Sequence, residues 1–270
     1  MPHHHLDEKN SLFYLHEPPS RAGAPTFFFV NALTGTTDHW EGFAGPKLRE
    51  AGFGTLSYNF RGQTESTFDP SVELTNEVIV SDIVALNEAL KPEKPIMVGL
   101  SIGGLFASQA CAAGVDAAGM VFLNTLRKIG PRIAWINDAL AHFAEIGGAA
   151  MFMNATFPMV VNPEFAAKAR PNFLKDGYAP PPPGDGHMNL IRNSPAAEWD
   201  FDWSSLAMPI LSITGEHDRV FRDPEIIDEL YATLQDARRE DWSDCGHMIP
   251  LERPERMVES LLRFGKEIEG

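Results

Sequence analysis

Gly99-Leu100-Ser101-Ile102-Gly103 lies between an apolar strand-like run, 95–98, and a helical run of small residues, 104–113. A strand, a sharp turn that carries serine and then a helix form the context in which a G-x-S-x-G motif presents a nucleophile. The turn holds the serine backbone in a strained conformation, and glycine at both flanks lets strand and helix approach without a Cβ clash. Ser101 is therefore the candidate nucleophile.

A candidate acid follows Ser101 in the chain. Serine is a weak nucleophile that needs a general base, and the base needs a carboxylate to orient it. The apolar run 209–214 leads into Gly215-Glu216-His217-Asp218, which places Asp218 just past the carboxyl end of a strand. Glu216 is the alternative acid. Asn124 also follows a strand-like run, but an amide does not stabilise an imidazolium as a carboxylate does.

A candidate base lies in the loop Asp244-Cys245-Gly246-His247-Met248, between a strand-like segment and a terminal helix that begins at Pro254. The order Ser101, Asp218, His247 is one of the known chain orders of a catalytic triad. His217 is a rival base, but it adjoins Asp218, and adjacent side chains point in different directions. We expect His3, His4 and His5 to be an unstructured terminus or a tag remnant.

Length and composition limit the class of protein. A chain of 270 residues suits one large α/β domain with an inserted subdomain. No run approaches the roughly 20 apolar residues that span a bilayer, and the N-terminus has no apolar signal region, so we expect a cytoplasmic protein without a membrane partner. The net charge of −15 argues against nucleic acid as a partner. The sequence leaves the oligomeric state open.

The two cysteines, Cys111 and Cys245, form neither a disulfide framework nor a metal-ligand spacing. We expect free thiols in a reducing compartment. The chemistry suggested by the three candidate residues requires no metal and no organic cofactor.

Strand-like runs alternate with helical ones, which predicts an α/β fold with a mostly parallel sheet flanked by helices. The alternation breaks between 126 and 207, where no buried strand is expected. Amphipathic stretches at 133–146 and 163–174 and a proline run at 179–183 stand there instead. We interpret 126–207 as a helical cap inserted after the strand at 119–123, and 1–125 with 208–270 as the core. The expected strands of the core are 26–30, 54–58, 96–98, 119–123 and 210–214, with a strand-like segment at 237–242.

Taken together, the serine turn, the acid loop and the histidine loop resemble the α/β-hydrolase family over nearly the whole chain. Within that family, three segments look closest to 3-oxoadipate enol-lactonases and related esterases and lactonases. These segments are Asn31-Ala32-Leu33-Thr34-Gly35-Thr36 with Trp40, the turn from Gly99 to Gly104, and Phe122-Leu123-Asn124-Thr125 followed by Gly130-Pro131 and Trp135.

The resemblance implies an oxyanion hole formed by the backbone N–H groups of Ile102 and Leu33. Many members carry His-Gly where this chain has Asn31-Ala32. A further segment, 58–62, usually begins with Asp, which is Asn59 here, and its Arg61 is interpreted as structural.

Two residues of the predicted cap are candidates for substrate binding. Arg127 lies four residues past the end of a strand, so it can pair with a substrate carboxylate, although a solvated cap charge is the alternative. Trp135 is the candidate for an apolar pocket wall, with cap packing as its alternative. Arg132 and Arg192 are weaker candidates.

These observations predict a serine hydrolase that cleaves a small carboxylic ester or lactone through an acyl-enzyme. The same triad also serves C–C bond hydrolysis, amide hydrolysis and cofactor-free perhydrolysis, because a fold and a triad do not fix the reaction. A ligand sensor with vestigial hydrolase activity is the alternative from another class. The predicted partner is a small-molecule substrate.

Overall fold

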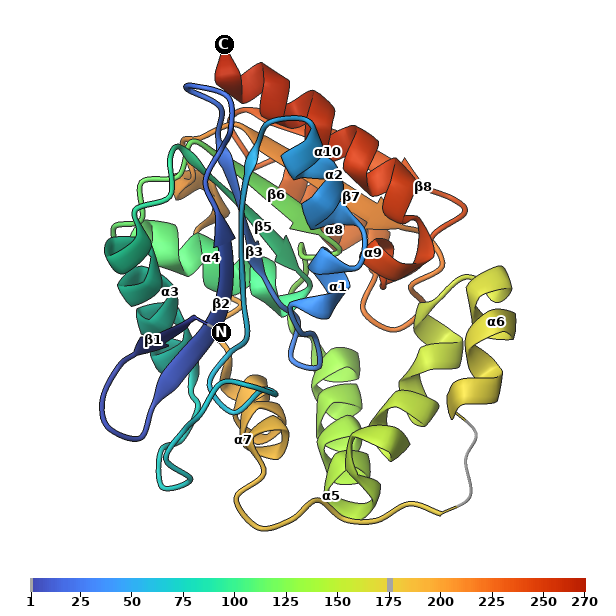
Figure 1. The fold of residues 1–270 in the computed structure, drawn as a ribbon. Helices are drawn as coiled ribbons and strands as arrows, with labels where there is room; N and C mark the ends of the chain where they lie inside the picture. The colour runs from blue at the N-terminus through green and yellow to red at the C-terminus, as the bar shows by residue number, and fades with distance from the viewer. Residues whose placement is uncertain (1, 174–176) are drawn as a thin grey trace.

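The computed structural model describes residues 2–173 and 177–270. In this part of the chain, eight strands form one sheet in the order β1-β2-β4-β3-β5-β6-β7-β8 (Figure 1). In this order, the six strands β4, β3, β5, β6, β7 and β8 each pair in parallel with their neighbours. Strand β2 pairs antiparallel with β4, and β1 pairs antiparallel with β2. The strands are β1 His3–His5, β2 Ser11–Glu17, β3 Thr26–Val30, β4 Gly54–Tyr58, β5 Pro95–Leu100, β6 Gly119–Leu123, β7 Ile210–Gly215 and β8 Ala237–Trp242. The predicted α/β class and mostly parallel sheet are confirmed.

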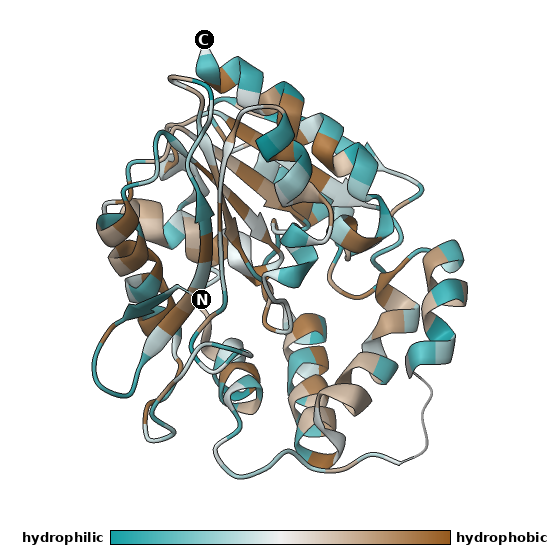
Figure 2. Cartoon of the chain, in the orientation of Figure 1, coloured by the Kyte–Doolittle hydropathy of each residue, from teal (hydrophilic) through white to brown (hydrophobic). Residues whose placement is uncertain are grey.

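The central strands are apolar because helices cover both of their faces. Every residue of β3, β4, β5 and β6 is buried, and Figure 2 shows hydrophobic residues along the central strands. Strand β8 differs, since only Trp242 of its six residues is buried. An edge strand with one paired side tolerates that polarity.

Helices form a layer on each face of the sheet. Apolar residues of α3, α4 and α8 pack on one face, and those of α1, α2, α9 and α10 pack on the other. The helices of these two layers are α1 Asp38–Glu41, α2 Ala44–Glu50, α3 Asn76–Leu90, α4 Ile102–Ala112, α8 Pro224–Tyr231, α9 Ile249–Glu252 and α10 Pro254–Glu269.

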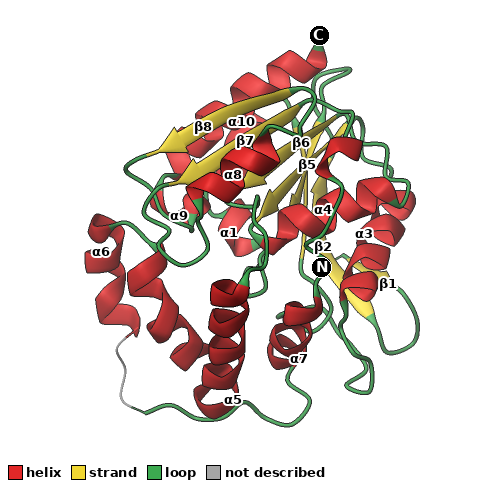
Figure 3. Ribbon diagram, turned by 180° about the vertical axis from the view of Figure 1, so that it is seen from behind, coloured by secondary structure: helices red, strands yellow, loops and turns green. Residues whose placement is uncertain are grey.

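The segment between β6 and β7 carries three helices that lie beyond the carboxyl ends of the parallel strands (Figure 3). These are α5 Pro131–Val160, α6 Pro163–Phe173 and α7 Gly186–Asn193. Helix α5 is interrupted at Gly147 and Gly148, whose backbone is not helical, and Gly148 has a φ of +67°. Leu174, the predicted end of the second cap stretch, lies outside the described residues. The boundaries 126 and 207 stay a prediction.

The chain returns from α7 to β7 through two short 3-10 helices, η1 Ser194–Ala196 and η2 Trp203–Ser205. Trp203 packs edge-on against Phe122 of β6, with ring centroids 5.4 Å apart. The last part of the predicted cap segment therefore packs on the core.

The expectation of an unstructured N-terminus is wrong, because His3, His4 and His5 form strand β1. They pair antiparallel with β2, and the ring of His3 lies edge-on to Phe13 with centroids 5.7 Å apart. The segment is held by pairing with β2 on one side, which three consecutive histidines do not signal. Within the described residues, no helix has both the length and the apolar character needed to cross a bilayer. Cys111 and Cys245 are free thiols.

Candidate active site

Ser101 lies at the turn between β5 and α4 with φ 58° and ψ −122°, a left-handed conformation that side chains rarely adopt. The surrounding glycines make this turn sterically possible. A Cβ on Gly99 would collide with Gly104, and a Cβ on Gly103 would collide with the carbonyl oxygens at the end of β3. The turn is thus built as the sequence predicts, with Ser101 8% exposed.

His247 and Asp218 form a buried pair. The distance between His247 Nδ1 and Asp218 Oδ2 is 2.6 Å, and the two side chains are 8% and 2% exposed. Asp218 Oδ1 accepts hydrogen bonds from the backbone N–H groups of Val220 and Phe221. Although burial by itself raises it, the pKa of Asp218 is held below its ordinary value by the charge of His247 and by these hydrogen bonds. Glu216 is exposed.

Asn124 connects the acid loop to the histidine loop. Its side-chain oxygen accepts from the N–H of Gly215, and its amide nitrogen donates to the carbonyl oxygens of Gly246 and His247, both at 3.0 Å. A carboxylate at this position would have no hydrogen to donate. The amide that rules Asn124 out as the acid is thus what lets it hold both loops.

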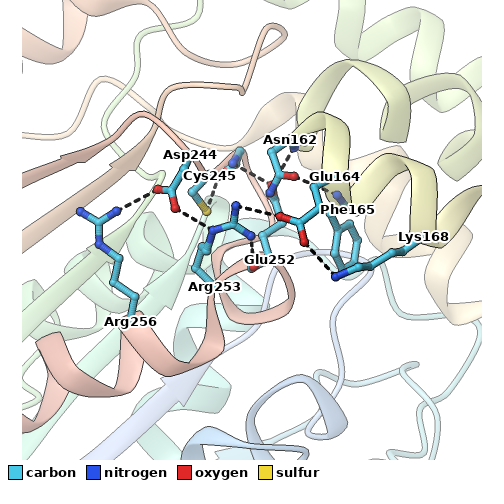
Figure 4. A network of polar contacts seen from close by, with 10 residues as sticks. Asn162, Glu164, Phe165, Lys168, Asp244, Cys245, Glu252, Arg253 and Arg256 are labelled. Carbon is cyan, nitrogen blue, oxygen red and sulfur yellow. Dashed lines mark hydrogen bonds and ion pairs between the residues drawn. The ribbon is translucent and has the colours of Figure 1, made fainter.

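Glu252 also holds the histidine loop in place (Figure 4). Its buried carboxylate accepts from the N–H groups of Gly246 and Met248, at 2.8 and 2.9 Å. It also accepts from the backbone N–H and the side-chain amide of Asn162, the residue between α5 and α6. Because the two residues flanking His247 are both held, the histidine backbone has little freedom to move.

The two residues whose backbone N–H groups are predicted to form the oxyanion hole line one cavity with Ser101 and His247. Ile102 begins α4, where the first N–H groups of a helix lack an intrahelical acceptor. Leu33 lies in the loop after β3. Among the described residues, neither the Ile102 nor the Leu33 N–H has a hydrogen-bond acceptor.

Arg127 lies beside Ser101 and is only 5% exposed. Its Nη2 donates to Ser101 Oγ at 3.0 Å and to the Asn124 carbonyl oxygen at 2.7 Å. The guanidinium carbon lies 4.7 Å from the Trp199 ring centroid and 4.9 Å from that of Phe221. Burial lowers the pKa of Arg127 to about 10, so the side chain is charged at neutral pH. The alternative of a solvated cap charge is therefore wrong.

In the described part of the chain, no direct ion pair neutralises the charge of Arg127. Nη1 has no hydrogen-bond acceptor within residues 2–173 and 177–270, and the neighbouring carboxylate, Asp218, acts on it only through space. Ser101 Oγ in turn receives its side-chain hydrogen bond from Arg127, and none with His247 occurs in this part of the chain. The Ser101 hydroxyl is thus turned toward Arg127.

The cavity has a volume of about 120 Å³, with apolar walls provided largely by α5. Leu140, Phe152 and Phe157 are among these walls. Trp135 does not join them: it is 78% exposed and outside the cavity lining. On α5 it lies on the solvent side, so its assignment to substrate binding is not supported by its place in the fold.

The remaining arginines lie outside the cavity lining. Arg61 pairs with the buried Asp82 through two hydrogen bonds of 2.6 and 2.7 Å, which agrees with a structural role. Arg192 pairs with Glu145 on the cap surface, and Arg132 is exposed. The described residues contain no group of three or more His, Cys, Asp or Glu side chains arranged to hold a metal ion.

Comparison with known proteins agrees with this architecture. A family model described as the alpha/beta hydrolase fold matches residues 25–254. The chain is 25% identical over 260 residues to 3-oxoadipate enol-lactonase 1 of Acinetobacter baylyi. This match covers 91% of this chain and 90% of the relative. It is 24% identical over 259 residues to a Mycobacterium tuberculosis protein named as a non-heme bromoperoxidase, with 87% and 92% covered.

A similar solved structure is that of a thermophilic esterase from Thermogutta terrifontis. It matches with a TM-score of 0.79 at 19% sequence identity, over 97% of this chain and 95% of the esterase. The chain belongs to the α/β-hydrolase fold family and is a hydrolase. The family resemblance seen in the sequence is confirmed.

Proposed function

We propose that this enzyme is a serine hydrolase that cleaves a small carboxylic ester or lactone through an acyl-enzyme. The observation that carries the proposal is the buried His247–Asp218 pair, whose histidine lines the same cavity as Ser101. A base oriented by a carboxylate, beside a serine on a strained turn, is the arrangement that activates a hydroxyl. The enol-lactonase and esterase names of its relatives support ester or lactone substrates.

In the proposed mechanism, Ser101 Oγ turns from Arg127 toward His247 and attacks the substrate carbonyl carbon. His247 accepts the hydroxyl proton, and Asp218 stabilises the imidazolium that results. The oxyanion of the tetrahedral intermediate accepts hydrogen bonds from the Leu33 and Ile102 N–H groups. His247 then protonates the leaving alcohol or enol, and later activates the water that hydrolyses the acyl-enzyme.

Arg127 is proposed to bind a carboxylate of the substrate. A buried cation without an ion-pair partner is costly, and an anionic ligand would compensate for that cost. Nη1 is available for this contact, and the flanking Trp199 and Phe221 rings hold the guanidinium plane in place. A carboxylate bound there would also draw Arg127 away from Ser101 Oγ.

Multiple-turnover hydrolysis of p-nitrophenyl esters and small lactones tests the proposal, with half of the substrates bearing a carboxylate. We expect sustained turnover in the wild type and a loss of kcat of about a thousand-fold or more in Ser101→Ala. A folded Ser101→Ala variant with wild-type turnover would contradict the mechanism. Circular dichroism and the unfolding midpoint verify that the variant is folded.

Perhydrolysis is the second candidate reaction, favoured by the bromoperoxidase name of one relative. The same acyl-enzyme would then be attacked by hydrogen peroxide in place of water. Peracid formation from a short carboxylic acid and peroxide, measured in the same protein, distinguishes this activity.

The ligand sensor is the alternative from another class. A stoichiometric burst of product in the ester assay, without further turnover, would favour it.

A further inference from the structure

Gln63 lies behind the loop that carries the predicted oxyanion donor Leu33, and its side chain is completely buried. The amide nitrogen donates to the Leu33 carbonyl oxygen at 2.9 Å and to the Ala32 carbonyl oxygen at 3.4 Å. The amide oxygen accepts from the N–H of Phe60 at 2.9 Å. One neutral side chain thus joins the loop after β3 to the loop after β4.

These contacts restrain the Ala32–Leu33 peptide unit, whose N–H would bind the oxyanion. In a trans peptide the C=O and the N–H are antiparallel and share one plane, so fixing the Ala32 carbonyl fixes the direction of the Leu33 N–H. The Ala32 oxygen accepts a second hydrogen bond from the Gly35 N–H at 2.9 Å. The bond to the Leu33 oxygen restrains the following peptide as well.

The far side of the same loop is held by Asn31. Its side-chain oxygen accepts from Trp40 Nε1 at 2.6 Å, and its amide nitrogen donates to the Tyr58 carbonyl oxygen at 2.8 Å. The Asn31 amide nitrogen also lies 3.4 Å from Gln63 Oε1. Asn31 anchors the start of the loop, while Gln63 holds the part that donates to the oxyanion.

The segment that carries Gln63 is itself fixed against helix α7. Gly62, with φ +79°, packs so closely on Gly186 that a Cβ on either residue would meet the other's backbone. Asn189 of α7 donates to the Val72 carbonyl oxygen and accepts from the Leu74 N–H. Gln63 therefore extends from a rigid support and not from a free loop.

We infer that Gln63 is a positioning residue for the oxyanion hole, aiming the Leu33 N–H into the cavity. This inference rests on the proposed function. An interaction that matters only when the oxyanion forms should affect kcat and leave KM nearly unchanged.

The first test is the Gln63→Met variant, which keeps the length of the side chain and removes its hydrogen bonds. We expect kcat to fall 10- to 100-fold with KM changed less than about threefold. Gln109→Met is the matched control, since Gln109 is partly buried and donates to one backbone carbonyl away from the cavity. An unchanged kcat, or a loss confined to KM, overturns the inference.

Hydrogen–deuterium exchange provides a readout that needs no substrate. Backbone amides of residues 31–36 should exchange faster in Gln63→Met than in the wild type and in Gln109→Met. Unchanged exchange overturns the inference even if the enzyme turns over. A wild type without Ser101-dependent turnover refutes the proposed function separately, since the exchange result stands on its own.

Gln63→Glu gives a second route if the methionine variant does not fold. The glutamate carboxylate still accepts the Phe60 N–H but has no hydrogen to donate to the Ala32 and Leu33 carbonyls. The same loss of kcat and the same faster exchange are expected. A folded Gln63→Glu variant with wild-type kcat and exchange overturns the inference.

Discussion

Side-chain amides hold the backbone of the site together at the residue scale. Asn124 donates to the histidine loop while accepting from the acid loop, and Gln63 does the same between the loops after β3 and β4. Aspartate or glutamate would supply acceptors only, and would place a second negative charge in a buried region. Among the charged groups, His247 and Arg127 line the cavity, Asp218 pairs with His247, and Glu252 holds the histidine loop.

Asp218→Asn should destabilise the protein in a pH-dependent way. The pKa of Asp218 is lowered in the folded state, so its carboxylate stabilises the fold above the unfolded pKa of about 3.9 and loses this effect as pH falls through the folded pKa. We expect a loss of about 2 kcal/mol in the free energy of unfolding at pH 7, measured by urea denaturation. The difference from the wild type should shrink below about pH 4. A difference that grows as pH falls would contradict the assigned direction of the shift.

Arg127→Met should change the charge preference of the enzyme. We expect the ratio of kcat/KM for carboxylate-bearing esters to that for matched neutral esters to fall about a hundred-fold, as for a lost charge-assisted hydrogen bond pair. Arg192→Met, which removes an exposed cap arginine, serves as the control and should leave the ratio unchanged. An equal loss for both substrate types would show that Arg127 acts on Ser101 and not on the substrate charge.

At the scale of elements, most of the candidate site residues come from the loops that follow the strands. Strand β5 and helix α4 provide Ser101, the loop after β7 provides Asp218, and the loop after β8 provides His247. The parallel arrangement brings the carboxyl ends of these strands to one edge of the sheet, so residues distant in the chain meet there. Precise alignment then depends on hydrogen bonds between loops, among them those of Asn124, Glu252 and Gln63.

Asn124→Asp tests this dependence on contacts between loops. The substitution preserves the shape of the side chain but leaves the Gly246 and His247 carbonyl oxygens without their donor and places a charge near Asp218. We expect a loss of about 2–3 kcal/mol in the free energy of unfolding, together with a reduced kcat. Asn193→Asp in the cap is the control, expected to cost less than about 1 kcal/mol. Equal losses in the two variants would argue against a special role for Asn124.

Trp135→Ala tests which face of α5 serves the substrate. The indole is exposed, so we expect kcat/KM to change less than about twofold and the free energy of unfolding to change little. Phe157→Ala, on the cavity side of α5, is the comparison and should lower kcat/KM clearly. A large loss in Trp135→Ala alone would restore that residue to the binding site.

At the scale of the whole molecule, the sequence predicts the parallel core because strands buried on both faces consist of continuous apolar residues. The triad candidates are recognisable since each follows a strand at the same edge. Strand β1 has no such pattern, because its stability comes from pairing with β2. The surroundings of Arg127 are equally hidden, since Trp199 and Phe221 reach it from distant segments. Trp135 and Phe157 lie on the two parts of α5, on either side of Gly147 and Gly148, and only the packing shows which of them reaches the cavity.

In the chain, the proline run at 179–183 lies between Ser101 and its proposed partners Asp218 and His247. The part of the chain before it includes Ser101, Leu33 and Ile102, while the part after it includes Asp218 and His247. Strands β6 and β7 are neighbours in the sheet but come from opposite sides of that point. A chain cut there would yield two inactive fragments whose reassociation through the sheet restores a complete site, so catalysis itself would report complementation.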